Sequence, residues 1–257
     1  MSSAFEWFER LTAAFALAGA IALGAASHAV AREDPPDVAR LVSFGGACQN
    51  CGLAGRRLVG AKFVGANFAG ASLAGSDLRG ATFIGSNFNG ADLTKADVRG
   101  GSMMGGHFLL TNFTDASLAG LEAHGVDFNN ANFTNAKAKG VDLTGSDLTR
   151  ADARGASFDD ANLIHANLAG GRFDRASFHG ARLVMSNFTD ADFTDADFRG
   201  ADFAGVSFAG ATLSGANFQG AHGLSQRQLD PACGDGRTRL PPGLTVKPCP
   251  GKTKHHP

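Results

Sequence analysis

Residues 61–70 read AKFVGANFAG, which is two successive copies of one five-residue unit, and the same spacing continues along most of the chain. From Leu53 to Phe218 every fifth residue is apolar: 17 of these 34 positions hold Phe, 12 hold Leu, and the rest hold Met, Val or Ala. Ala stands two residues before the apolar residue in 20 units, and Gly stands two residues after it in 22. The unit is therefore Ala-x-(Phe/Leu)-x-Gly, repeated without a slip in register.

A five-residue period is incompatible with both regular secondary structures. In an α-helix, five steps turn the side chain about 140° away from its predecessor, and in a straight strand they place successive apolar residues on opposite faces. The chain must therefore turn once in every unit. Gly two residues after the apolar position supplies the positive φ for such a corner, and the Asn and Asp residues that replace it tolerate the same region. Lys95, Arg150 and Met185 fit the corner less well.

Short straight segments joined by regular corners predict a solenoid whose large residues point inward and stack on the next coil. The small residue two positions earlier must also point inward, where its size lets neighbouring backbones approach. The expected structural core includes Phe63, Phe68, Phe83, Phe88, Phe113, Phe133, Phe173, Phe193 and Phe203.

The pattern, seen for example in Ala61-Lys62-Phe63-Val64-Gly65 and in the unit that follows it, closely resembles the pentapeptide repeat family. That resemblance covers about two-thirds of the chain. It implies an all-β fold, a right-handed quadrilateral parallel β-helix with four units in each coil. The 34 units then make about 8 to 9 coils, or a rod about 40 Å long at about 4.8 Å per coil.

The middle of this rod is expected to be its softest part. The large apolar position shrinks to alanine at Ala123, Ala138 and Ala153, and glycine takes the small position at Gly101 and Gly106. Less apolar volume inside a coil means fewer contacts between neighbouring coils.

The amino-terminal residues predict a signal peptide over 1–31. Arg10 precedes an apolar run of about 16 residues, Leu11 to Ala26, and Ala29-Val30-Ala31 fits a small-x-small cleavage pattern. The run is shorter than the roughly 20 residues of a membrane-spanning helix, although Glu6 and Glu9 make the leading segment less basic than usual. We expect a mature chain from about Arg32, periplasmic or secreted. The alternatives are an uncleaved membrane anchor and a buried helix.

Beyond the signal, the expected organisation is a linker and amino-terminal cap over 32–50, the solenoid over 51–221, and a carboxyl-terminal region over 222–257. The residues after Ser225 predict a short capped helix, followed by a proline-rich loop and a tail. Caps are needed because the ends of a solenoid expose apolar edges.

Four cysteines are compatible with two disulfides in an exported protein. Because the two pairs lie at opposite ends of a rod of about 40 Å, bridging within one molecule leaves Cys48 with Cys51 and Cys233 with Cys249. The C-x-x-C spacing of the first pair is also that of a redox motif or half of a zinc site. No second C-x-x-C accompanies it, which favours a structural bridge.

No catalytic, cofactor-binding or metal-binding residue is predicted. With four units per coil, residues 20 apart share a column, and His107, His124, His165 and His179 fall in different columns. One column forms a polar ladder, which is either a structural device joining coils or a recognition strip. This polar ladder consists of Asn67, Asn87, His107, Asp127, Asp147, Asn167 and Asn187.

These observations favour a non-catalytic, exported structural or interaction scaffold that presents a polar surface. Its partner would be a protein or an envelope component, with no nucleic acid, no cofactor, no membrane contact beyond the signal, and a homodimer as one possible state. The family resemblance also implies an alternative, a DNA mimic that binds or protects a type II topoisomerase. Between Leu53 and Asn217, however, 17 acidic residues stand against 14 basic ones, which is little negative charge for a mimic of duplex phosphate.

Overall fold

The computed structural model describes residues 43–44 and 46–250. By compactness the chain divides into Met1–Pro36 and Asp37–Pro257, and only the second unit contains described residues. The signal peptide predicted over 1–31 and most of the cap predicted over 32–50 therefore lie outside the described residues.

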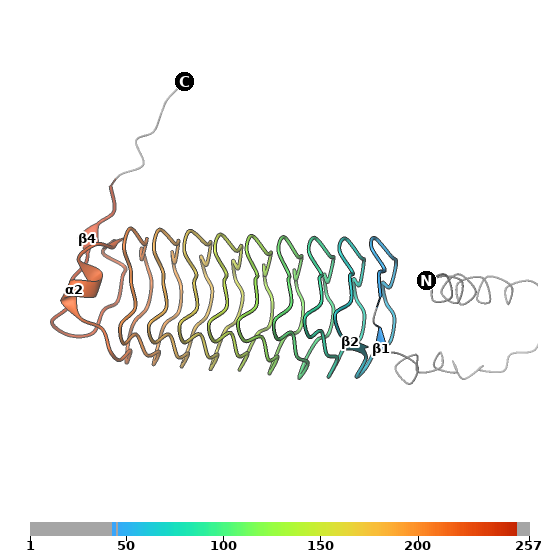
Figure 1. Ribbon diagram of the computed structural model, residues 1–257. Helices are drawn as coiled ribbons and strands as arrows, with labels where there is room; N and C mark the ends of the chain where they lie inside the picture. Colours follow the sequence, from blue (N-terminus) through green and yellow to red (C-terminus); the bar gives the residue numbers. More distant parts are fainter. Residues whose placement is uncertain (1–42, 45, 251–257) are drawn as a thin grey trace, which may run out of the picture. The chain divides into compact units, whose positions relative to one another are not determined.

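Parallel β-bridges join each outward residue in the middle of a unit to the residue 20 positions later, from Ala47 with Asn67 to Asp202 with His222. One coil thus contains four five-residue units, and the coils stack one on another (Figure 1). The predicted right-handed quadrilateral β-helix is confirmed. The series of β-bridges between coils already includes Ala47, one unit before the solenoid boundary predicted at residue 51.

Regular strands in this fold are very short because a corner interrupts the chain in every unit. Strand β1, Ser43–Phe44, pairs in parallel with β2, Lys62–Phe63. In the coils that follow, one residue of each flat segment bridges the coil before it and the coil after it, and the backbone bonds between coils are reciprocal. Leu53 N–H donates to the carbonyl of Ser72 at 2.7 Å, and Ser72 N–H donates to the carbonyl of Cys51 at 2.9 Å. These hydrogen bonds between coils satisfy backbone N–H and C=O groups that would otherwise be buried without a partner.

Every fifth residue from Gly55 to Gly220 has positive φ, between 54° at Asn130 and 71° at Gly205. The predicted corners are therefore confirmed. Lys95 and Met185 adopt φ of 57° and 59°, although neither side chain favours this region. A left-handed conformation costs a residue with a side chain about 1–2 kcal/mol, so the stack of coils imposes the corner on these residues.

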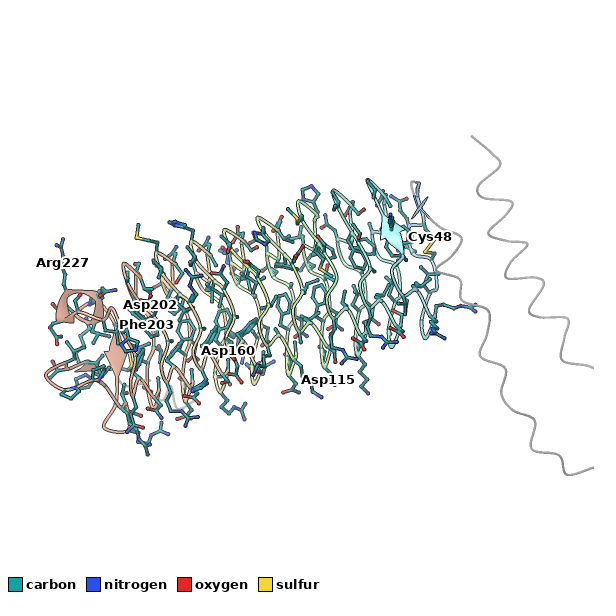
Figure 2. All side chains as sticks on the ribbon, turned by 90° about the horizontal axis from the view of Figure 1, so that it is seen from below. Cys48, Asp115, Asp160, Asp202, Phe203 and Arg227 are labelled. Atoms are coloured by element: carbon teal, nitrogen blue, oxygen red, sulfur yellow. A yellow bond between two sulfur atoms is a disulfide. The ribbon has the colours of Figure 1, made fainter. Side chains whose placement is uncertain are left out.

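All 34 large positions of the repeat are buried, including every phenylalanine predicted for the core. Most rings one coil apart are stacked: the centroids of Phe63 and Phe83 lie 5.1 Å apart with an interplanar angle of 4°, and those of Phe113 and Phe133 lie 4.9 Å apart. Several rings of neighbouring units meet edge to face, as Phe63 and Phe68 do. Figure 2 shows such rings, with Phe203 labelled, inside the coil, whereas Asp115 and Asp160 project from its corners.

In the middle coils, the small positions partly compensate for the alanines at the large positions. In the unit that contains Ala123 at its large position, the small position holds Leu121, which is buried. The large and the small residue of this unit are therefore interchanged. Glycine also has a steric reason at Gly101, where an added Cβ would lie 2.7 Å from the carbonyl oxygen of Ala81. The reduced stability expected of this region remains a prediction.

The carboxyl-terminal region covers the last coil. Helix α2, Gln226–Leu229, follows Ser225, and the Gln228 amide donates hydrogen bonds of 2.8 Å and 3.2 Å to the carbonyls of Phe203 and Val206. Strand β3, Cys233–Gly234, extends the ladder because Thr212 pairs with Cys233, and β4, Lys247–Pro248, pairs in parallel with β3. Pro248 has no N–H to donate to a further strand.

Candidate interaction surface

The polar ladder lies on one flat face of the coil. Parallel bridges join its seven residues in order from Asn67 to Asn187, so their side chains project outward one above another. The six Asn and Asp side chains of the ladder are each held at their base: Asn87 Oδ1, for example, accepts a hydrogen bond of 3.0 Å from the backbone N–H of Asn89. These six side chains thus have a fixed direction.

In its later part, the ladder bonds to itself across coils. Asn129 Nδ2 donates to Asp127 Oδ1 at 3.1 Å and to Asp147 Oδ2 at 2.8 Å, which joins two carboxylates on adjacent coils through one amide. Without this amide the two carboxylates would repel each other.

The bonded chain continues through the next two coils. Thr149 Oγ1 donates to Asp147, Asn167 Nδ2 donates to Thr149 Oγ1 at 2.9 Å, and Asn187 Nδ2 donates to Asn167 Oδ1 at 3.1 Å. From Asp127 to Asn187 the ladder therefore has the structural role that the sequence left open.

The earlier part of the ladder differs. Among the described residues, no hydrogen bond joins the side chains of Asn67, Asn87 and His107 to one another, although they also occupy successive coils. Asn67 Oδ1 accepts from the N–H of Ala69, so the amide is oriented while its NH₂ group remains available. This segment is the part of the ladder that can bind a partner without first breaking bonds within the protein.

A second polar arrangement was not predicted from the sequence. Arg79, Arg99, Arg154 and Arg199 each bond to the aspartate two residues earlier, and the Arg99 guanidinium donates to Asp97 at 2.8 Å and 2.6 Å. Elsewhere threonine takes the arginine position and donates its hydroxyl at 2.6 to 2.7 Å. These pairs are Asp92 with Thr94, Asn112 with Thr114, Asn132 with Thr134, Asp142 with Thr144, Asn187 with Thr189, and Asp192 with Thr194.

The signal for these pairs was present in the sequence as Asp or Asn, then the large apolar residue, then Thr or Arg. The arginine hydrogen bonds hold the pKa values of Asp77, Asp97 and Asp197 below their ordinary value of 3.8. These carboxylates are thus ionised and paired at neutral pH, which reduces the negative potential of the surface.

The cysteines lie in the two pairs that the sequence predicts. Cys48 and Cys51 have Cα atoms 5.4 Å apart, across the first corner, and those of Cys233 and Cys249 lie 4.6 Å apart, joining β3 to β4. Of the histidines, His124 contacts a carboxylate, with its Nε2 3.3 Å from Asp142 Oδ2. Residues 43–44 and 46–250 contain no group of three or more metal-ligating side chains, and none of their helices could span a membrane.

An open groove of about 620 Å³ lies between the last coils and the carboxyl-terminal region. Arg199 and Arg237 line it, but both are paired: Arg237 contacts Asp195 at 2.8 Å and Asp235 at 2.9 Å.

Comparison with known proteins identifies the repeat. A family model described as pentapeptide repeats matches in eight copies at residues 61–100, 111–150, 156–195 and 186–222, more than half of the chain. The chain belongs to the pentapeptide repeat family. Among curated proteins, this pentapeptide repeat protein has no match.

Solved structures of other pentapeptide repeat proteins are similar to it at low sequence identity. QnrB1, a plasmid-mediated fluoroquinolone resistance protein, is 21% identical, with 73% of this chain and 91% of QnrB1 covered and a TM-score of 0.47. HetL of Nostoc, involved in heterocyst differentiation regulation, is 25% identical, with 76% and 91% covered and a TM-score of 0.42. A protein of the Arabidopsis thaliana thylakoid lumen is 28% identical, with 59% and 69% covered and a TM-score of 0.17. These similarities are too distant to transfer a function.

Proposed function

We propose that this pentapeptide repeat protein is a non-catalytic, exported scaffold that binds a protein or another envelope component through the early part of its polar ladder. The observation that carries the proposal is the contrast within the ladder. Its later part is bonded to itself, whereas among the described residues no hydrogen bond joins the side chains of Asn67, Asn87 and His107 to one another, and backbone N–H groups orient the two asparagines. A rigid surface whose polar groups are already oriented loses little conformational entropy when it binds.

Export is supported by the apolar run that precedes a small-x-small motif and by two cysteine pairs within bonding distance. We expect fractionation of cells producing a tagged full-length chain to recover the protein outside the cytoplasm. Recovery only from the cytoplasm would refute the export part of the proposal.

Site-specific photo-crosslinking tests the binding surface. A photoreactive residue at Asn87 should capture a discrete partner in cells. The matched control carries the same photoreactive residue at Ser157. Like Asn87, Ser157 is the bridged outward residue of its unit, but it lies on another face of the coil. Equal capture from both positions would show that the ladder is not the binding surface.

The alternative of a topoisomerase-binding DNA mimic is weakened by the structure, because Asp77, Asp97, Asp152 and Asp197 are neutralised by arginines rather than aligned as free charges. A mimic needs a continuous negative surface potential. Inhibition of DNA supercoiling by the purified protein at low concentration would favour this alternative over the scaffold.

A further inference from the structure

Three apolar side chains lie exposed along one corner of the coil. Val64, Ile84 and Met104 occupy the same corner position in successive coils and are 47%, 44% and 43% exposed. Backbone hydrogen bonds stack them directly, since Gly65 N–H donates to the Ile84 carbonyl at 3.0 Å and Gly85 N–H donates to the Met104 carbonyl at 3.2 Å. We call these three side chains the corner ridge. Consecutive exposed apolar residues of this kind mark an interaction site more often than a solvated surface.

Opposite charges stand at the two ends of the corner ridge. Parallel bridges connect Lys62, Thr82, Ser102 and Glu122 in a column beside it. Lys62 and Glu122 are exposed, and within the described part of the chain neither forms an ion pair. The column thus runs from a positive end to a negative end through two uncharged residues.

This distribution of charge is complementary to itself in one orientation. If a second copy lies antiparallel, with the two-fold axis between the coils of Ile84 and Met104, then Ile84 faces Met104 of the other copy. The same rotation places Lys62 opposite Glu122 on both sides of the axis. A parallel two-fold arrangement would instead place the two columns on opposite sides of the ridge with Lys62 level with Lys62, so that no pair between Lys62 and Glu122 forms.

We propose that the corner ridge is an interface between two antiparallel copies of this chain. Apolar contact between Ile84 of each copy and Met104 of the other supplies the affinity, Val64 faces His124, and the two charge pairs set the orientation. A two-fold interface of this type closes on itself and stops at a dimer. The ridge spans only a few coils, so the buried area falls in the range of weak or transient complexes. The inference goes beyond the proposed scaffold function and depends neither on export nor on the ladder.

Sedimentation velocity of the purified full-length chain over a concentration series tests the proposal. We expect a reversible monomer–dimer equilibrium that Ile84→Asp weakens at least about tenfold, because a carboxylate would be desolvated in the interface. The control is Leu110→Asp at a different corner, where the side chain is 63% exposed, and it should leave the equilibrium unchanged. Circular dichroism verifies that both variants fold.

Charge exchange provides the decisive measurement. Lys62→Glu and Glu122→Lys should each weaken the dimer, since each places like charges together, and the double variant should restore it. A wild-type protein that remains monomeric at about millimolar concentration would overturn the proposal. So would a dimer that survives Ile84→Asp, or a double variant that is no better than the single ones.

Discussion

The guanidinium of Arg79 donates two hydrogen bonds of 2.7 Å to the carboxylate of Asp77, from Nε to Oδ1 and from Nη2 to Oδ2. The two residues flank Leu78, which points into the core. Because side chains alternate between the faces of an extended segment, residues on either side of an inward residue both point outward and meet. The five-residue repeat therefore creates an outward pair in every unit, and the residue types in that pair decide the surface chemistry.

The arginine–aspartate pairs predict a pH dependence of stability. Because arginine lowers the pKa values of Asp77, Asp97 and Asp197, the pairs stabilise the folded protein above the ordinary pKa of 3.8. This stabilisation is lost as pH falls through the lower folded-state pKa. We expect the triple variant Arg79→Gln, Arg99→Gln and Arg199→Gln to be less stable than wild type at pH 5 to 7, by a small amount because the pairs are exposed.

Urea unfolding at pH 7, 5, 3 and 2 measures this difference. The gap between wild type and the triple variant should narrow below pH 4 and also shrink at high salt, which screens exposed pairs. A gap that stays constant down to pH 2 would mean that the arginines stabilise the protein through packing alone.

Leu121 is predicted to be essential for the middle coils. Leu121→Ala removes a buried side chain beside Ala123 and should lower the free energy of unfolding by about 2–5 kcal/mol. The control Glu122→Ala changes the exposed neighbour and should stay within about 0.5 kcal/mol. Denaturant titration provides both values, and equal effects would show that Leu121 contributes no packing energy.

Gly75 isolates the contribution of the corner conformation. Its φ is 64°, and an added Cβ would meet no atom within 4 Å, so Gly75→Ala tests backbone strain without a steric clash. We expect a loss of about 1–2 kcal/mol in the free energy of unfolding. Gly75→Asn should cost less because asparagine tolerates this region. The reverse order of stability in thermal unfolding would contradict the strain explanation.

The bridge between Cys233 and Cys249 should stabilise the carboxyl-terminal region. It closes a loop over a sequence separation of 16, for which the chain-entropy estimate is about 3 kcal/mol. A non-reducing peptide mass map of exported protein should show Cys233 linked to Cys249 and Cys48 linked to Cys51. Free thiols in that map would refute both bridges. The variant Cys249→Ser should lower the unfolding midpoint, and reduction of wild type, which opens both bridges, should lower it at least as much.

Much of the interior was predictable from the sequence because the repeat is strictly local. Each unit by itself specifies an inward apolar residue, an inward small residue and a corner. Accordingly the burial of Phe63 and Phe203 and the positive φ of corner residues such as Gly75 and Asn130 were correctly predicted, whereas Lys95, which fits the corner less well, adopts the same φ. The residues alone do not specify the number of units in a coil, since a five-residue period is compatible with any number of corners. The resemblance to the family supplied that number.

Only the tertiary structure decided which outward residues meet. Side chains 18 or 20 residues apart, such as Asn129 with Asp147 and Asn167 with Asn187, become neighbours when the coil closes, and whether they bond depends on their rotamers. The same holds for the corner ridge and for the last rungs, where Cys233 pairs with Thr212 and Arg239 with Asn217, outside the 20-residue spacing. The sequence by itself determined what faces inward, because burial is repeated identically in every unit. The surface depended on contacts between coils, and a local repeat does not encode them.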